Sequence, residues 1–338
     1  MVGILARLLT LVRCVAGALA LAFIVAMATP VSAQQPNSVN PNAAAVQEQQ
    51  LLQQLKVIEG RGSIPDMKSY VLEHPAGRDW REFHTVTLKW IGGIAMISIL
   101  ALLTIYYSWH GTMRIEEGRS GRTMMRFNMF ERFVHWMTAV TFVILAITGL
   151  NITFGRSLIL PWLGAPAFSE WSEWAKFSHN YLSFAFTAGV VLMFLIWVGR
   201  NLPSYNDLVW FKSGGGMFGG KEPPAEKFNG GEKLIFWIST FGGGGVIVTG
   251  FVLLFPFYGT TVANMELAEI VHSVVAVLYV SAMFVHIYMG TIGVEGAFEA
   301  MADGTVDVNW AKERHSIWYE EETQGGAAAP AQAMRPAE

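Results

Sequence analysis

The stretch at residues 270–294 constrains the fold of this chain more than any other. It has 25 residues, contains no Asp, Glu, Lys or Arg, and carries two histidines, His272 and His286. About 20 apolar residues suffice to cross the hydrocarbon core of a bilayer, so a membrane-spanning helix is predicted here. The histidines are fourteen residues apart. At ~100° and ~1.5 Å per residue, both leave one helix face, about 21 Å apart along its axis. Ionisable side chains within a membrane helix mark functional sites and need partners.

The composition also indicates a membrane protein. Of the 338 residues, 52% are hydrophobic and only 14% are charged, whereas soluble domains average about 25% charged residues. The net charge of −3, without a basic patch of interleaved aromatic residues, gives no indication of nucleic-acid binding. The single cysteine, Cys14, excludes a C-x-x-C-H haem attachment, an iron–sulfur cluster and a disulfide framework in this chain. Histidine is therefore the main soft ligand available.

The first 33 residues have the pattern of a cleavable secretory signal peptide. Arg7 and Arg13 precede an apolar region at 15–28, and a small-residue cleavage site follows at 31–33. A retained N-terminal membrane helix is the alternative. Residues 34–83 are polar, with Gln, Asn and Pro clusters at their start, and are predicted to be an exported segment. The composition of this segment is equally compatible with an interaction arm and with a disordered linker.

Five long apolar runs follow, at residues 90–109, 133–155, 177–199, 234–258 and 270–294. Basic residues are concentrated in two of the loops between them, and this asymmetry predicts that those loops are cytoplasmic. The first helix then runs inward, so the N-terminus after signal cleavage is periplasmic and the C-terminus cytoplasmic. The basic residues in these loops are Arg114, Arg119, Arg122, Arg126 and Arg132 in the first, and Arg200, Lys212, Lys221, Lys227 and Lys233 in the second.

The direction of each helix gives each histidine a depth in the membrane. His135 lies near the start of the run at 133–155, which crosses the membrane from the cytoplasm outward. It is therefore near the cytoplasmic face, at the depth of His286. His179 lies near the start of the run at 177–199, which crosses inward, so it is near the outer face, at the depth of His272. Two imidazoles at one depth on different helices can ligate one haem iron from both sides, which suits electron transfer. We therefore predict an inner haem on His135 and His286 and an outer haem on His179 and His272.

Other interpretations of the histidines remain open. Four separate packing histidines are the simplest, and zinc is disfavoured because it takes four ligands at one point. A proton pathway usually adds membrane carboxylates, which these five runs lack. His84 and His110 flank the first run and are predicted to be interfacial, while His74 and His315 lie in polar segments and are predicted to be solvated.

Several segments, taken in order, resemble the gamma subunit of membrane-bound, quinone-reducing formate dehydrogenase, a diheme cytochrome b. The resemblance covers about residues 126–320. It rests on 131–136 (ERFVHW), 179–181 (HNY), 228–233 (FNGGEK), 236–237 (FW), 271–272 (VH), 286–290 (HIYMG) and 310–319 (WAKERHSIWY). The signal peptide, the exported segment and the first helix depart from the simplest pattern of that family.

The resemblance implies a four-helix membrane domain whose four haem-ligand positions coincide with His135, His179, His272 and His286. It also implies a quinone site near the inner haem, formed by Asn229, Gly231 and His286. From the sequence alone, Asn229 reads as an ordinary helix N-cap. The implied cofactors are two haem b groups, with ubiquinone or menaquinone as substrate. The implied partners are an iron–sulfur beta subunit and a molybdenum or tungsten catalytic alpha subunit. The resemblance is also compatible with a higher oligomer of the complex.

The predicted fold is all-α: a four-helix transmembrane cytochrome b bundle with one extra N-terminal transmembrane helix after the signal peptide. The expected segments are 1–33 (signal), 34–83 (exported), 84–110 (extra helix), 126–320 (diheme domain) and 321–338 (disordered tail). The expected function is electron transfer from the iron–sulfur partner to quinone in a bacterial inner membrane, with formate oxidised in another subunit and no catalytic residue in this chain. A cytochrome b serving a hydrogenase or another molybdoenzyme is one alternative, and a haem-free membrane anchor or transporter is another.

Overall fold

The computed structural model describes residues 75–217, 222–256 and 258–325. Five helical segments in this part of the chain are long and apolar enough to cross a membrane. They are Asp79–His110, Met129–Leu158, Leu160–Arg200, Gly230–Leu254 and Val262–Gly293. Each predicted apolar run falls on one of them. The predicted signal peptide, most of the exported segment and the last residues of the tail lie outside the described residues.

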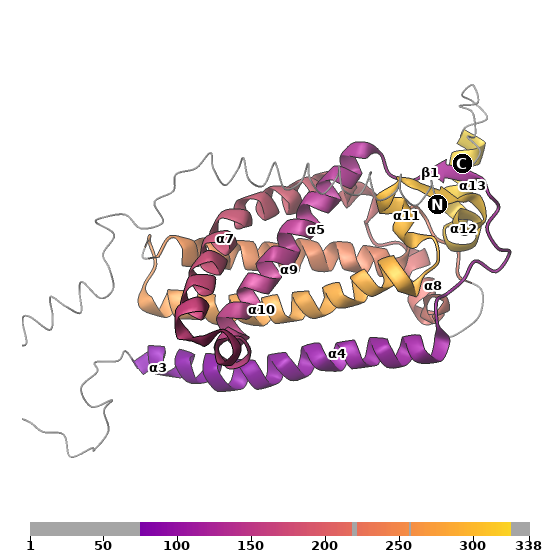
Figure 1. Ribbon diagram of the computed structural model, residues 1–338. Coiled ribbons are helices and arrows are strands. Elements are labelled where there is room, and N and C mark those ends of the chain that lie inside the picture. The colour runs from indigo at the N-terminus through magenta and orange to yellow at the C-terminus, as the bar shows by residue number, and fades with distance from the viewer. Residues whose placement is uncertain (1–74, 218–221, 257, 326–338) are drawn as a thin grey trace, which may run out of the picture.

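The extra N-terminal helix, α4 (Leu88–His110), lies along one side of the bundle (Figure 1). It is continuous with α3 (Pro75–Glu82) through a π-helical turn, η2 (Phe83–Thr87), so the helix starts before the predicted boundary at residue 84. It packs against α10, where a Cβ added at Gly92 would lie 3.2 Å from Val277. Trp90, Ile94 and Ile97 are exposed, as suits contact with lipid tails.

The other four membrane helices form two hairpins. Helix α5 (Met129–Leu150) packs against α7 (Leu160–Trp197), and α9 (Gly230–Leu254) packs against α10 (Val262–Tyr288). A π-helical turn extends α5 (η3, Asn151–Gly155) and another extends α10 (η6, Met289–Gly293). The short α6 (Arg156–Leu158) and a kink at Gly164, whose φ is 73°, make the connection between α5 and α7 helical. The loop expected before residue 177 is therefore an extension of α7, which curves over the end of the bundle in Figure 1.

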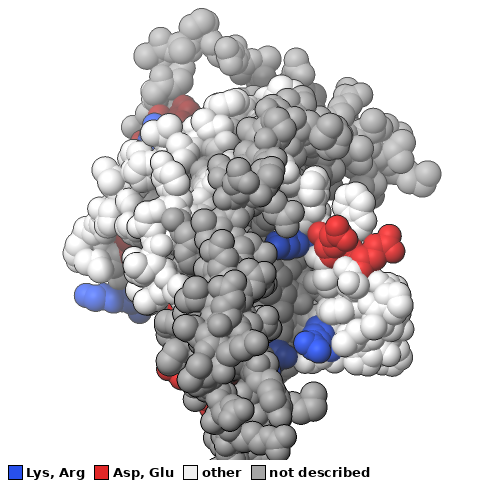
Figure 2. Space-filling view, turned by 90° about the vertical axis from the view of Figure 1, so that its left-hand side faces the viewer, with Lys and Arg blue, Asp and Glu red and all other residues white. Residues whose placement is uncertain are grey.

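Figure 2 looks onto the end of the molecule where α3 begins. The described surface in this view is mostly uncharged, with basic and acidic side chains scattered around it. The connections at this end correspond to the loops in which the sequence places few Lys and Arg residues. The two ends of the bundle therefore differ in the number of basic residues in their connections.

Both hairpins begin with the same local structure. Asn128 accepts a hydrogen bond from the Glu131 amide at 2.9 Å, and the Glu131 carboxylate accepts one from the Asn128 amide at 2.8 Å. Asn229 and Glu232 form the same reciprocal capping box at the start of α9, at 2.9 and 3.0 Å. A capping box satisfies two amide groups that a helix N-terminus otherwise leaves without partners. These boxes explain why α5 and α9 begin where they do.

The opposite end of the bundle is covered by short elements, and we call it the capped end. It carries α8 (Tyr205–Lys212), α11 (Ala297–Ala302), α12 (Val308–Arg314) and α13 (Ser316–Gly325). Strands β1 (Thr123–Met125) and β2 (Thr305–Asp307) pair antiparallel there, with Met124 opposite Val306. The fold is therefore helical with one small sheet. Helix α13 also enters the segment predicted to be a disordered tail, since it continues to Gly325.

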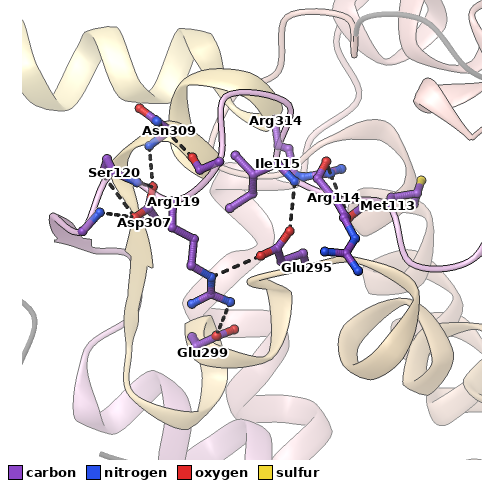
Figure 3. A network of polar contacts seen from close by, with 12 residues as sticks. Met113, Arg114, Ile115, Arg119, Ser120, Glu295, Glu299, Asp307, Asn309 and Arg314 are labelled. Atoms are coloured by element: carbon purple, nitrogen blue, oxygen red, sulfur yellow. Dashed lines mark hydrogen bonds and ion pairs between the residues drawn. The ribbon is translucent and has the colours of Figure 1, made fainter.

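A polar network ties the segment after α4 to the segment after α10 (Figure 3). The Glu295 carboxylate accepts from the Ile115 amide at 3.2 Å and from Arg119 at 3.3 Å, and Arg119 also reaches Glu299 at 2.9 Å. Asp307 accepts from the Ser120 amide at 3.2 Å. Arg119 and the Ile115 amide hold the pKa of Glu295 below its ordinary value. This network anchors the extra N-terminal helix to the four-helix domain.

Candidate functional site

The first histidine pair lies near the capped end. His135 is in the second turn of α5, and His286 is near the end of α10. Their ring centroids are 6.2 Å apart, and their planes make an angle of 64°. Both rings are half-buried and face one another across the two hairpins. These are the two residues that the depth argument assigns to the inner pair.

The second pair lies nearer the other end. His179 of α7 and His272 of α10 have ring centroids 6.3 Å apart and an interplanar angle of 67°. Both line a cavity that is partly open to the outside of the molecule. Phe142, Phe186 and Tyr279 also line it, so its walls are largely apolar.

The geometry of each pair fits one metal ion between two rings. An imidazole nitrogen lies about 2 Å from a metal that it ligates, so two rings on either side of one ion have centres about 6 Å apart. Within residues 75–217, 222–256 and 258–325, no group of three or more His, Cys, Asp or Glu side chains could hold a metal ion. Each pair thus offers two protein ligands to a metal ion. Such a pair fits haem, whose iron would take one imidazole from each histidine.

The Nδ1 atoms of His179 and His272 each contact a threonine hydroxyl. Thr148 Oγ1 lies 2.9 Å from His179 Nδ1, and Thr249 Oγ1 lies 3.0 Å from His272 Nδ1. A glycine follows each threonine. A Cβ added at Gly149 would lie 3.3 Å from the His179 ring, and one at Gly250 would lie 3.4 Å from the His272 ring. Each ring thus lies against a Thr-Gly step of the neighbouring helix in its hairpin.

These threonines are absent from the sequence predictions, although an internal repeat points to them. Residues 126–149 and 227–250 match at a constant spacing of 101 residues. The first contains RFNMFER and ends in TG, and the second contains KFNGGEK and ends in TG. The repeat aligns the capping boxes, the tryptophans Trp136 and Trp237, and the two Thr-Gly steps. It does not duplicate His135, whose counterpart is Phe236.

The residues expected at a quinone site lie at the start of α9. Asn229 is the N-cap of that helix, as the sequence alone suggests. Gly231 lies beneath the Trp210 indole, where an added Cβ would come within 2.7 Å of the ring. Among the described contacts, no hydrogen bond joins either residue to His286. The structure therefore gives each a local role, and their binding of quinone stays a prediction.

The remaining histidines differ from one another. His315, predicted to be solvated, is buried with 1% of its surface exposed, so that prediction is wrong. It packs 5.0 Å from the Trp310 ring, and its Nδ1 lies 2.7 Å from the Glu226 carbonyl oxygen. Burial, followed by the neighbouring Arg126 guanidinium, lowers the pKa of His315 to about 4. The polar sequence around it does not reveal the aromatic residues that cover it.

His84 and His110 lie away from the two pairs. His84 packs against Trp80, with ring centroids 5.1 Å apart, and His110 stacks on Tyr106 at 4.6 Å. Both flank the membrane-length part of α4, where an interfacial position was predicted. His74 lies outside the described residues.

The fold and the paired histidines define a multi-pass membrane bundle of the cytochrome b type. The family model of prokaryotic cytochrome b561 matches residues 126–304, and the chain belongs to this family. The matched range contains both hairpins and all four histidines. The extra helix α4 lies before it.

Similarity to individual proteins supports the resemblance seen in the sequence motifs. The chain is 28% identical over 203 residues to the Escherichia coli (strain K12) protein named formate dehydrogenase, cytochrome b556(fdo) subunit. The alignment covers 59% of this chain and 93% of that protein. The nitrate-inducible cytochrome b556(Fdn) subunit of the same strain is 24% identical over 209 residues, covering 59% and 92%. The formate dehydrogenase cytochrome b556 subunit of Haemophilus influenzae is 27% identical over 197 residues, covering 56% and 80%.

Proposed function

We propose that this chain is the membrane cytochrome b subunit of a formate dehydrogenase. It carries electrons from an iron–sulfur beta subunit to quinone near the cytoplasmic side of a bacterial inner membrane. Formate is oxidised in a separate alpha subunit that holds molybdenum or tungsten. The names of the similar cytochrome b556 subunits support this assignment.

The opposed histidine pairs are the observation that carries the proposal. His179 and His272 hold one b haem, and His135 and His286 hold the other. When bound, haem supplies one-electron transfer, and two axial imidazoles leave no open position for oxygen. His272 and His286 lie on one helix, fourteen residues apart. At ~1.5 Å per residue this spacing extends about 21 Å, which is most of the hydrocarbon thickness.

The distribution of basic residues predicts how the chain is oriented in the membrane. The basic loops between α4 and α5 and between α7 and α9 meet at the capped end. By the positive-inside rule this end is cytoplasmic, so the N-terminus is periplasmic after signal cleavage. The pair formed by His179 and His272 then faces the periplasmic partner, and the pair formed by His135 and His286 lies near the cytoplasm. Electrons moving inward carry negative charge across most of the membrane.

Quinone reduction is assigned to the inner pair. Asn229 and Gly231 start α9 at the capped end, and His286 ends α10 at the same end. A quinone reduced here takes its protons from the cytoplasmic side. Proton uptake inside, together with inward electron movement, contributes to the membrane potential.

The proposal is tested on the native complex. The complex is solubilised, its subunits are identified, and a reduced-minus-oxidised spectrum is recorded after adding formate. We expect b-type absorption from two haems per chain, reduced by formate and reoxidised by a quinone analogue. Reduction by hydrogen but not by formate would assign the chain to a hydrogenase instead. A native complex without b-type absorption would refute the cytochrome assignment and favour a haem-free anchor.

A further inference from the structure

The two outer histidines have equivalent hydrogen-bond partners. His179 Nδ1 contacts Thr148 Oγ1 at 2.9 Å. His272 Nδ1 contacts Thr249 Oγ1 at 3.0 Å. The 101-residue repeat aligns the two threonines with each other. Each ring therefore faces a hydroxyl of the neighbouring helix in its hairpin.

The threonine hydroxyls indicate which ring nitrogen carries the proton. Thr148 donates to the Ile144 carbonyl at 2.8 Å and Thr249 donates to the Gly245 carbonyl at 2.7 Å. With its own proton engaged there, each hydroxyl oxygen accepts from the ring, which requires N–H at Nδ1 of both histidines. Nε2 of both rings is then unprotonated, as a metal ligand must be.

The inner pair lacks the same arrangement. His135 Nδ1 is buried and has no hydrogen-bond partner within the described part of the chain. The repeat places Phe236 of α9 at the position of His135 in α5, so the inner pair has no symmetric counterpart. The outer site thus lies between equivalent helices with equivalent partners, whereas the inner site does not.

We propose that Thr148 and Thr249 are positioning residues that hold His179 and His272 as axial ligands and lower the reduction potential of the outer haem. This inference rests on the haem ligation proposed above. A hydrogen bond donated from the second ring nitrogen raises the basicity of a ligating imidazole. A more basic ligand stabilises the ferric state, and such bonds are a recognised means of setting haem potentials. Because His135 lacks this bond, the contribution favours electron movement from the outer to the inner site.

The adjacent glycines complete the arrangement. A Cβ at Gly149 or Gly250 would lie 3.3 or 3.4 Å from Cε1 of the ring that the preceding threonine contacts. Glycine lets each imidazole lie close enough to the helix backbone to reach the threonine hydroxyl. The Thr-Gly step therefore sets both the hydrogen bond and the approach of the ring.

Thr148→Val and Thr249→Val test the proposal, because valine keeps the shape and removes the hydroxyl. The readouts are the midpoint potential of the outer haem in a redox titration and the electron paramagnetic resonance spectrum of the oxidised protein. The outer component is the one lost in His179→Ala. We expect each variant to raise the reduced-to-oxidised ratio of that haem at fixed ambient potential by up to about tenfold, which is about 59 mV for one electron. Haem content should stay unchanged, since both histidines remain in place.

Two variants serve as controls. Thr148→Ser keeps a hydroxyl and should keep the potential. Thr141→Val removes a hydroxyl that is fully buried on the same helix and bonded to the Met137 carbonyl at 2.8 Å. It should leave the outer potential unchanged. If the Thr148→Val and Thr249→Val potentials match the wild type, or if Thr141→Val shifts the potential equally, the proposal is wrong. If the purified wild-type complex contains no haem, the proposed function fails first, so the two failures are distinguishable.

Discussion

Arg126 and Glu232 form a 3.0 Å ion pair that joins the beginnings of the two hairpins. The repeat forms an equivalent ion pair in the opposite direction. Lys227 aligns with Arg126 and lies 3.3 Å from Glu131, which aligns with Glu232. Each repeat thus donates a cation to the capping box of the other. Such reciprocal contacts are typical of two-fold related surfaces. The exchange joins the N-terminal ends of α5 and α9, where the two hairpins meet.

Arg126→Gln is expected to destabilise the bundle by about 2 kcal/mol, because it removes a buried guanidinium whose hydrogen bonds to the half-buried Glu232 carboxylate and to the Lys227 carbonyl are charge-assisted. The Arg126 side chain is 3% exposed and also donates to the Lys227 carbonyl at 2.7 Å. The measurement is thermal unfolding of the detergent-solubilised protein. Arg119→Gln is the control, because that side chain is 44% exposed and pairs with Glu299 at 2.9 Å. It should cost less than about 1 kcal/mol. Equal losses in the two variants would contradict a structural role for the exchange.

His315 is expected to make the capped end sensitive to acid. Its pKa is lowered to about 4 in the folded protein from an ordinary 6.5, so the unfolded chain binds the proton more readily. Its contribution to stability is therefore present above pH 6.5 and is lost as the pH falls through 4. The difference between these pKa values corresponds to roughly 3 kcal/mol. Hydrogen exchange of the α12 and α13 amides between pH 7 and 4 measures it. His315→Gln should flatten this dependence, and an unchanged slope in the variant would show that another group is responsible.

Gly149→Ala and Gly250→Ala are expected to displace the outer imidazoles, because the added methyl group would lie 3.3 or 3.4 Å from the ring. The predicted result is a changed electron paramagnetic resonance signal of the outer haem, with the inner signal unaffected. Gly244→Ala is a matched control on α9, since its Cβ meets no atom of the described residues within 4 Å. An equal change of the outer signal in Gly244→Ala and Gly250→Ala would show that the short distance between Gly250 and the His272 ring is not the cause.

The sequence predicts well the features that depend on long local patterns. Charge-free runs indicate all five membrane-length helices, and the spacing of His272 and His286 places them on one face of α10. The helix directions also select the two pairs whose rings lie 6.2 and 6.3 Å apart. Their ligation of haem stays a prediction, because imidazole proximity does not by itself identify the bound group.

Features that depend on tertiary packing could not be predicted in the same way. His315 lies in a polar segment, and only the folded capped end covers it with Trp310 and Trp318. The residues before 177 become part of α7, which resumes after the non-helical Gly164 and continues into the membrane-spanning run. Thr148 and Thr249 look like ordinary membrane-helix threonines until their distances to the histidines are known. The 101-residue repeat marks them, but its meaning depends on the arrangement of the hairpins.

The haem content of four single histidine variants tests the central claim most directly. His135→Ala and His286→Ala should each leave one b haem per chain, with the same absorption band missing from both reduced-minus-oxidised spectra. His179→Ala and His272→Ala should each remove the other band. The helical content, measured by circular dichroism, should match that of the wild type. Loss of different bands within one pair, or of both haems from a folded variant, would contradict the two-site account.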